Sequence, residues 1–299
     1  MSKNTFAIGG VHPHDNKIAR NCPIEVLPPA PSMFLSVAQH IGAPSVPVVA
    51  VGDKVKVGQV IAEPGGFVSA FIHSSVSGTV KSIGPRADLA GRPVTHIEIA
   101  VEGDEWLESI DTTDTLITEI PADNKAIIEK IRQGGVVGLG GATFPTHVKL
   151  SPPPGSKCER VIINGCECEP YLTSDFRVLL EKGEQVVVGA AILRQVMGNV
   201  PCTIAIEENK PEAIAHIREV IARLGYGDMD VMVTTLSTMG LFFCTASYTA
   251  RAVPTFWTTA PTLIGRPPEP TWRCITASMS CFSEPCGYLI FMVITSMPS

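Results

Sequence analysis

The spacing of apolar residues changes along this chain, and the change limits the fold to two dissimilar parts. From Pro47 to Ile83, short valine-rich runs alternate with Gly and Asp turns, which is typical of β structure. From about Asn124 the spacing becomes helical, and three isoleucines lie on one side of a helix that we predict at 124–133. Gly134-Gly135 is a typical end signal for this helix. We therefore expect a β-rich part followed by an α/β part.

Strands and helices alternate in the second part. The predicted elements are a strand at 161–163, helices at 176–183 and 186–196, a strand at 203–206 and a helix at 211–224. Such alternation predicts a parallel sheet covered by helices. A sheet of this kind places ligand sites at the carboxyl ends of its strands.

Length, charge and hydropathy exclude several classes of protein. A chain of 299 residues is long enough for two domains. The net charge of -6 argues against nucleic acid as a partner, because binding phosphates needs a basic face. No secretion signal is recognisable, and no apolar stretch reaches the ~20 residues that cross a bilayer. We therefore expect a cytoplasmic protein with no direct membrane span, which reaches a membrane only through partners.

The segment Gly134 to Leu150, GGVVGLGGATFPTHVKL, is the strongest candidate site. Five glycines in eight residues allow several backbone N–H groups to point into one small volume, which suits a phosphate that Lys149 could neutralise. A flexible surface loop is the alternative for a glycine-rich run alone. The spacing is not the G-x-G-x-x-G of a Rossmann turn, so a different nucleotide site is indicated.

A second candidate site, Asn164 to Tyr171 (NGCECEPY), follows the strand at 161–163 directly. Two carboxylates and an Asn here are costly if merely buried, so we expect them to face a ligand or water. Cys166 and Cys168 have C-x-C spacing without the companion cysteines of a zinc or iron–sulfur site. Metal binding is therefore the lesser alternative, and Cys168 is expected to line the pocket.

GLGGATFPTHVKL together with INGCECEPYLTSD resembles the RnfC subunit of the Rnf electron-transport complex, a flavin-binding relative of the NADH-oxidising subunit of respiratory complex I. HPHDNK, the segment 47–63 and GFVSAFIHSSVSG resemble the N-terminal carrier-like domain of the same family. The likeness covers about residues 6–236. The first part is similar to biotinyl and lipoyl carriers but has no lysine at a hairpin tip.

The resemblance implies a fold and a site. It implies a β-rich barrel-sandwich domain at 1–110, an α/β flavin domain with a parallel sheet at 120–236, and an atypical tail at 237–299. It also implies flavin mononucleotide (FMN) held by Gly138, Gly140, Gly141, Lys149, Asn164 and Glu167, with Phe144 and Glu169 on the nicotinamide side.

The function implied by the family is oxidation of NADH through FMN, with electrons passed to iron–sulfur centres. Its partners would be the other subunits of a complex on the cytoplasmic side of the inner membrane. The family's 4Fe–4S cysteine runs are absent here, because the spacing of Cys274, Cys281 and Cys286 does not fit them. A Gly-Gly-Glu segment expected after Leu236 is also absent.

Two alternatives stay open from the sequence. The chain could be a non-catalytic, carrier-like docking module of a multisubunit complex, with the glycine-rich segment serving only as structure. The tail at 237–299, which shows no sustained helical or strand periodicity, could be a frameshifted end or a segment that folds only against a partner.

Overall fold

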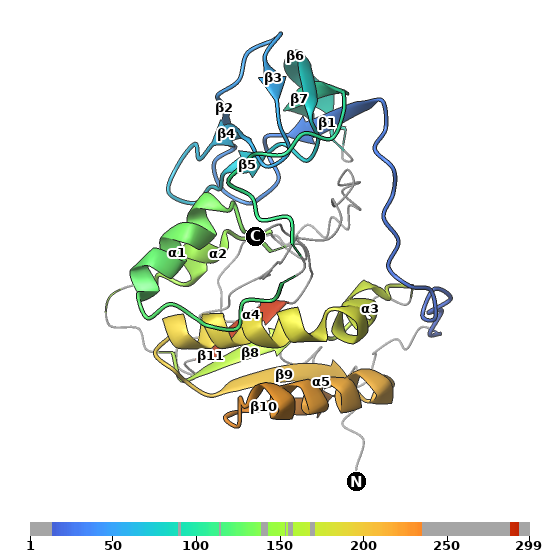
Figure 1. Cartoon of the computed structure of the whole chain (residues 1–299), viewed down its shortest axis with the longest axis vertical. Helices are drawn as coiled ribbons and strands as arrows, with labels where there is room; N and C mark the ends of the chain where they lie inside the picture. The colour runs from blue at the N-terminus through green and yellow to red at the C-terminus, as the bar shows by residue number, and fades with distance from the viewer. Residues whose placement is uncertain are drawn as a thin grey trace. The chain divides into compact units, whose positions relative to one another are not determined.

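The computed structural model describes residues 14–88, 91–113, 115–138, 143–152, 154, 158–167 and 171–234, and the backbone of 288–292 (Figure 1). Contacts divide these residues into two compact units. The barrel unit is Glu25–Ser151, and the sheet unit contains residues 14–24, the residues from Pro152 to 234 and the strand at 288–292. This division does not test the domain limits that we predicted from the sequence, and those limits stay predictions.

The barrel unit contains two antiparallel sheets. The larger has the order β1-β7-β6-β3, and the smaller has the order β2-β4-β5. The strand bounds are β1 Ser32–Ser36, β2 Val46–Pro47, β3 Lys54–Val55, β4 Val60–Glu63, β5 Ile72–His73, β6 Gly78–Ala87 and β7 Pro93–Val101. Side chains from both sheets form one apolar core around Ile61, Ile97 and Ile99, which are fully buried. The predicted barrel-sandwich class is confirmed.

Helix α1 (Asn124–Gln133) belongs to the barrel unit and begins and ends as its sequence predicts. The carboxylate of Asp123 accepts hydrogen bonds from the N–H groups of Lys125 and Ala126, at 2.9 and 3.2 Å. Such a cap satisfies donors that have no partner inside the helix. The helix ends at Gln133, Gly134 is its C-cap residue, and Gly135 follows with φ +63°.

Gly135, at the end of α1, packs closely against the loop before β5. A Cβ atom at Gly135 would lie 2.2 Å from the carbonyl oxygen of Phe71, so only glycine fits between the two backbones. The guanidinium of Arg132 lies over the Phe71 ring, 5.3 Å from its centroid. The barrel therefore supports the start of the glycine-rich segment.

The sheet unit is built on a parallel sheet with the order β10-β9-β8-β11. Its elements are β8 Arg160–Asn164, α3 Ser174–Glu181, α4 Gly183–Val196, β9 Cys202–Glu207, α5 Pro211–Leu224, β10 Met229–Thr234 and β11 Tyr288–Met292. Helix α4 packs on β8 and β9 and beside α5, which packs on β10 (Figure 1). The predicted parallel, helix-covered sheet is confirmed. All six residues of β9 are buried, as expected of a central parallel strand.

Strand β11 is an element that the sequence did not predict. Its five residues, YLIFM, pair in parallel register with β8 from Tyr288 opposite Arg160 to Met292 opposite Asn164. A short apolar run without alternation gives no periodic signal, and for this reason periodicity does not reveal the strand. The rest of the predicted tail lies outside the described residues.

None of the described helices is both long enough and apolar enough to span a bilayer.

The contact at Gly135 predicts a position-specific loss of stability. Replacing Gly198, which has φ +93° and open space around it, with Ala should cost about 1–2 kcal/mol through backbone strain alone. Gly135→Ala should cost a further ~1–3 kcal/mol, because the new methyl group overlaps the Phe71 carbonyl. Urea unfolding followed by circular dichroism measures both losses, and equal losses would contradict the close approach.

Candidate functional site

The structure describes five of the eight predicted site residues. Gly138, Phe144 and Lys149 lie in the barrel unit, and Asn164 and Glu167 lie in the sheet unit. Gly140, Gly141 and Glu169 lie outside the described residues, as does Cys168. Because the two groups belong to different units, a site that joins them stays a prediction.

The described ends of the glycine-rich segment pair with each other. The N–H of Gly138 donates to the carbonyl of Phe144 at 3.0 Å, and the N–H of Thr146 donates to the carbonyl of Val136 at 2.9 Å. Val137 and Pro145 form an antiparallel bridge between them. The Gly138 amide is thus used inside the fold, and the stem that it closes leads into the short helix α2 (Thr146–Lys149).

Lys149 is a buried lysine at the end of this segment, with only 2 % of its surface exposed. Burial removes water from the ammonium group and lowers the pKa of Lys149 to about 7. At His147, burial and then the positive charge of Arg132 lower the pKa. A nearby anion would favour the protonated form of Lys149, so this group is suited to respond to a bound phosphate.

At the carboxyl end of β8, Asn164 starts a tight turn. Its buried side-chain oxygen accepts a hydrogen bond from the N–H of Cys166 at 3.0 Å. The N–H of Gly165 donates to the carbonyl of Ala205 at 2.9 Å, and the Cys166 thiol lies 3.1 Å from the Thr234 hydroxyl. The turn is therefore held against β9, the neighbouring strand, and against the end of β10 on the far side of β9.

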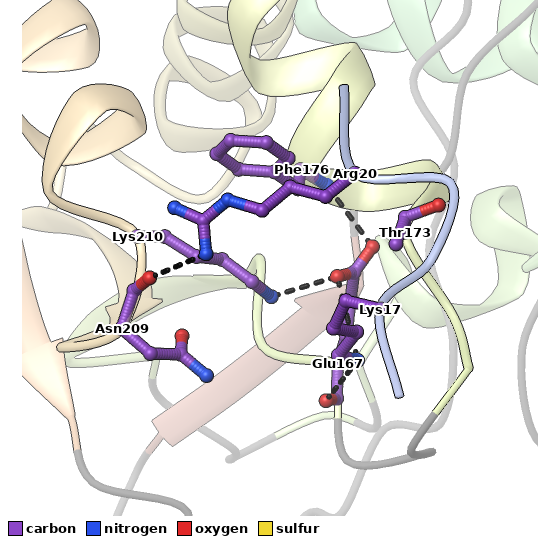
Figure 2. A pocket seen from close by; sticks show the side chains of 7 residues that line it. All are labelled: Lys17, Arg20, Glu167, Thr173, Phe176, Asn209 and Lys210. Carbon is purple, nitrogen blue, oxygen red and sulfur yellow. Dashed lines mark hydrogen bonds and ion pairs between the residues drawn. The ribbon is translucent and has the colours of Figure 1, made fainter. Parts of the chain in front are cut away.

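Glu167 lies at the centre of a buried group of four charges, which we call the four-charge cluster: Lys17, Glu167, Glu207 and Lys210. The Glu167 carboxylate accepts one hydrogen bond from the N–H of Phe176 at 3.0 Å and another from the Lys210 ammonium at 2.7 Å (Figure 2). Lys210 also donates to Glu207 at 2.7 Å. The Lys17 ammonium lies 3.8 Å from the Glu167 carboxylate.

The electrostatics of the four-charge cluster favour the charged form of its central lysine. Burial alone would lower the pKa of Lys210, but the carboxylates of Glu167 and Glu207 outweigh burial and raise it. We expected Glu167 to face a ligand or water. It does not face water in the structure, because Glu167 is 1 % exposed and its charge is matched by lysines. A direct contact between Glu167 and flavin stays a prediction.

A small pocket opens beside the four-charge cluster. Its lining residues are Lys17, Arg20, Glu167, Thr173, Phe176, Asn209 and Lys210 (Figure 2). Its volume is about 190 Å³ including the open mouth. Its enclosed volume is only about 10 Å³, which is room for about one water molecule, so this pocket does not hold a flavin.

The sequence alone assigned no role to Lys17, Glu207 or Lys210. The pair Glu207 and Lys210 had a detectable signal, since a carboxylate ends the largely apolar strand CTIAIE and a lysine follows three residues later. Lys17 had no such signal, because its partner Glu167 is 150 residues away along the chain. Among the described residues, no group of three or more His, Cys, Asp or Glu side chains could hold a metal ion.

Comparison with known proteins identifies the class of each part. Residues 5–105 match the family described as the RnfC barrel sandwich hybrid domain, and residues 131–246 match the family described as the Nuo51 FMN-binding domain. The chain thus combines a barrel-sandwich domain with an FMN-binding domain of the complex I type. The second match contains the glycine-rich segment, β8 and the turn that starts at Asn164.

Individual relatives are more specific. The chain is 46% identical over 213 residues to the C subunit of the proton-translocating ferredoxin:NAD(+) oxidoreductase complex of Clostridium ljungdahlii, covering 71% of this chain and 46% of the relative. It is 38% identical over 218 residues to the Na(+)-translocating counterpart of Acetobacterium woodii, covering 71% and 48%. It is 38% identical over 225 residues to the C subunit of the ion-translocating oxidoreductase complex of Pseudomonas aeruginosa, covering 75% and 29%.

These matches confirm the resemblance: over the matched residues, the chain is a homologue of the RnfC subunit of the Rnf complex and belongs to that family. The chain spans less than half the length of each of these three relatives.

The four-charge cluster predicts a large loss of stability on removal of its central cation. Lys210→Met would leave Glu167 and Glu207 buried beside each other, which should cost about 3–5 kcal/mol. Adding Glu207→Gln should recover part of the loss, because one of the uncompensated charges is removed. Arg218→Met on the exposed face of α5 is the matched control, and urea unfolding measures all three. A Lys210→Met variant as stable as the control would refute the claim that Lys210 compensates the two buried carboxylates.

Lys149 predicts a stability difference that depends on pH. Between pH 7 and about 10.5 the unfolded chain binds a proton at Lys149 that the folded chain has released, so the free energy of unfolding rises with pH through this group. Below pH 7, Lys149→Met should therefore be more stable than the parent by on the order of 3–5 kcal/mol. The difference should shrink as the pH approaches 10. Urea unfolding at pH 6, 8 and 10 measures it, and a constant difference would contradict the lowered pKa.

Proposed function

We propose that this chain is the FMN-bearing electron-transfer subunit of a membrane-associated oxidoreductase complex, in which the flavin accepts electrons from NADH. One observation carries the proposal: the match to an FMN-binding domain over 131–246 includes both candidate segments, the glycine-rich one and the turn after β8. Each segment contributes groups of the kind that a flavin nucleotide needs.

The proposed cofactor contacts follow the chemistry of these side chains. The backbone at Gly138, Gly140 and Gly141 would surround the phosphate, and the ammonium of Lys149 would hold a proton against its charge. Asn164 and Glu167 would lie near polar groups of the flavin, and Phe144 and Glu169 would lie on the nicotinamide side. The family resemblance implies this set of residues, and the described part of the set includes a buried lysine, whose protonated form an anion beside it would favour.

Bound FMN would supply acceptance of two electrons as hydride and their release one at a time. The residues of this chain would do the rest. Lys149 would fix the phosphate end, and the half-buried ring of Phe144 would exclude water from the side where a nicotinamide stacks. The turn that starts at Asn164 would hold polar groups at the carboxyl edge of the sheet.

The names of the relatives support the proposed partners. Two are subunits of ferredoxin:NAD(+) oxidoreductase complexes, and all three belong to ion-translocating or cation-translocating complexes. We propose that the chain binds other subunits of such a complex on the cytoplasmic side of the inner membrane, and that 4Fe–4S centres receive the electrons from the flavin.

Titration with FMN tests the proposal directly. Addition of flavin-free chain to FMN should quench its fluorescence saturably, and the purified protein should retain flavin absorbance. Lys149→Met should weaken binding by roughly 10- to 100-fold, because a charge-assisted hydrogen bond is lost. Lys125→Met, which removes an exposed lysine of α1, is the control and should bind like the parent. Absence of saturable binding by the parent would refute the flavin assignment and favour the docking module.

The pKa of Lys149 predicts a pH dependence of FMN binding. If the phosphate binds the protonated lysine, the dissociation constant should rise above pH 7 by up to about tenfold per pH unit, since the free protein then loses that proton. Above pH 7 a phosphate monoester is already largely dianionic, so the ligand contributes little to this slope. Calorimetry in two buffers should detect proton uptake at pH 8 by the parent and none by Lys149→Met. Equal slopes for the two proteins would contradict the role of Lys149.

A further inference from the structure

Residues 14–24 lie in the sheet unit, although the barrel-sandwich match spans 5–105. Figure 2 shows this segment beside Glu167, with Lys17 near Glu167 and Arg20 pointing toward Asn209. A segment from the start of the chain thus contacts residues near positions 167 and 209. We call residues 14–24 the N-terminal strap.

Lys17 makes the most buried contacts of the strap. Its ammonium donates to the backbone carbonyl of Leu172 at 2.6 Å and to that of Glu167 at 3.2 Å, and its side chain is 9% exposed. These two carbonyls stand at the two ends of the segment 167–172. One ammonium group therefore holds both ends of the segment together.

The charge of Lys17 also balances the four-charge cluster. Two lysines and two glutamates give the cluster a net charge of zero, and loss of Lys17 would leave one negative charge uncompensated in a buried place. The same side chain thus has a geometric and an electrostatic effect on Glu167.

Other contacts fix the strap independently of Lys17. The guanidinium of Arg20 donates to the carbonyl of Asn209 at 3.0 Å and to the Glu212 carboxylate at 2.9 Å, and it lies 4.8 Å from the centroid of the Phe176 ring. The N–H of Ile24 donates to the carboxylate of Glu181 at 3.1 Å. These contacts anchor the strap to α3 and α5, so its attachment does not depend on Lys17 alone.

We propose that Lys17 is a positioning residue for Glu167 and Leu172, whose carbonyls it holds together, and that the N-terminal strap is a functional part of the flavin domain. The effect on the cofactor rests on the proposed function. The effect on the segment itself does not, because it follows from contacts within the sheet unit.

Hydrogen exchange tests the positioning role without any cofactor. In the full chain, Lys17→Met should speed amide exchange in peptides that cover 165–173 by about 10-fold or more, because two charge-assisted hydrogen bonds are lost. Arg20→Met is the matched control, since it removes a strap cation that touches neither carbonyl of the segment. Lys17→Arg keeps the charge and the donors and should restore most of the protection. Exchange in Lys17→Met that equals exchange in Arg20→Met would overturn the proposal.

FMN titration of the same variants separates this inference from the proposed function. Lys17→Met should raise the dissociation constant for FMN by roughly 10-fold, and Arg20→Met should leave it within about twofold even if both variants lower Tm equally. If the parent binds no FMN while exchange in 165–173 still responds to Lys17→Met, the flavin assignment fails and the positioning role stands. If the parent binds FMN and Lys17→Met binds it equally well, the link from Lys17 to the cofactor is wrong.

Discussion

Charge burial is the constraint on which the sheet unit depends. Two carboxylates stand at or just after the ends of β8 and β9, where they are nearly inaccessible to water. Buried carboxylates are tolerated only when cations and hydrogen bonds compensate them. Lys210 supplies one cation from the start of α5, and Lys17 supplies the other from the N-terminal strap. The need to neutralise these two carboxylates therefore holds the strap, β8, β9 and α5 together.

Most helices and strands could be predicted, because their apolar spacing and their end signals lie in adjacent sequence. The helix at 124–133 has its cap and its glycine end in adjacent sequence, and the alternation after it predicts a parallel sheet. Strand β11 could not be found this way, since five consecutive apolar residues give no period. The position of the strap could not be predicted either, because Lys17 and Glu167 are 150 residues apart and their contact produces no pattern in local residue spacing.

The candidate site divides in the same way. The glycine-rich segment was identifiable from its density of glycines, and the turn after β8 was identifiable because two carboxylates and an Asn follow a buried strand. Sequence alone could not tell which of their polar groups the fold uses for itself. The Gly138 amide and the Glu167 carboxylate form hydrogen bonds within the chain. These partners depend on how the chain packs, so the sequence alone does not reveal them.

The two buried lysines show how one residue type serves two purposes. Lys149 and Lys210 are almost equally inaccessible to water, yet their pKa values move in opposite directions. At Lys210, carboxylates outweigh the cost of burial and fix the charge, so this lysine is part of the frame. At Lys149, burial dominates and brings the pKa to about 7, so its charge can change with what is bound beside it. A group with a pKa near 7 can gain a proton when an anion binds beside it, whereas a structural ion pair needs a charge that does not change. On this ground Lys149 is the stronger candidate for contact with an anionic cofactor, and Lys210 supports the segment that carries Glu167.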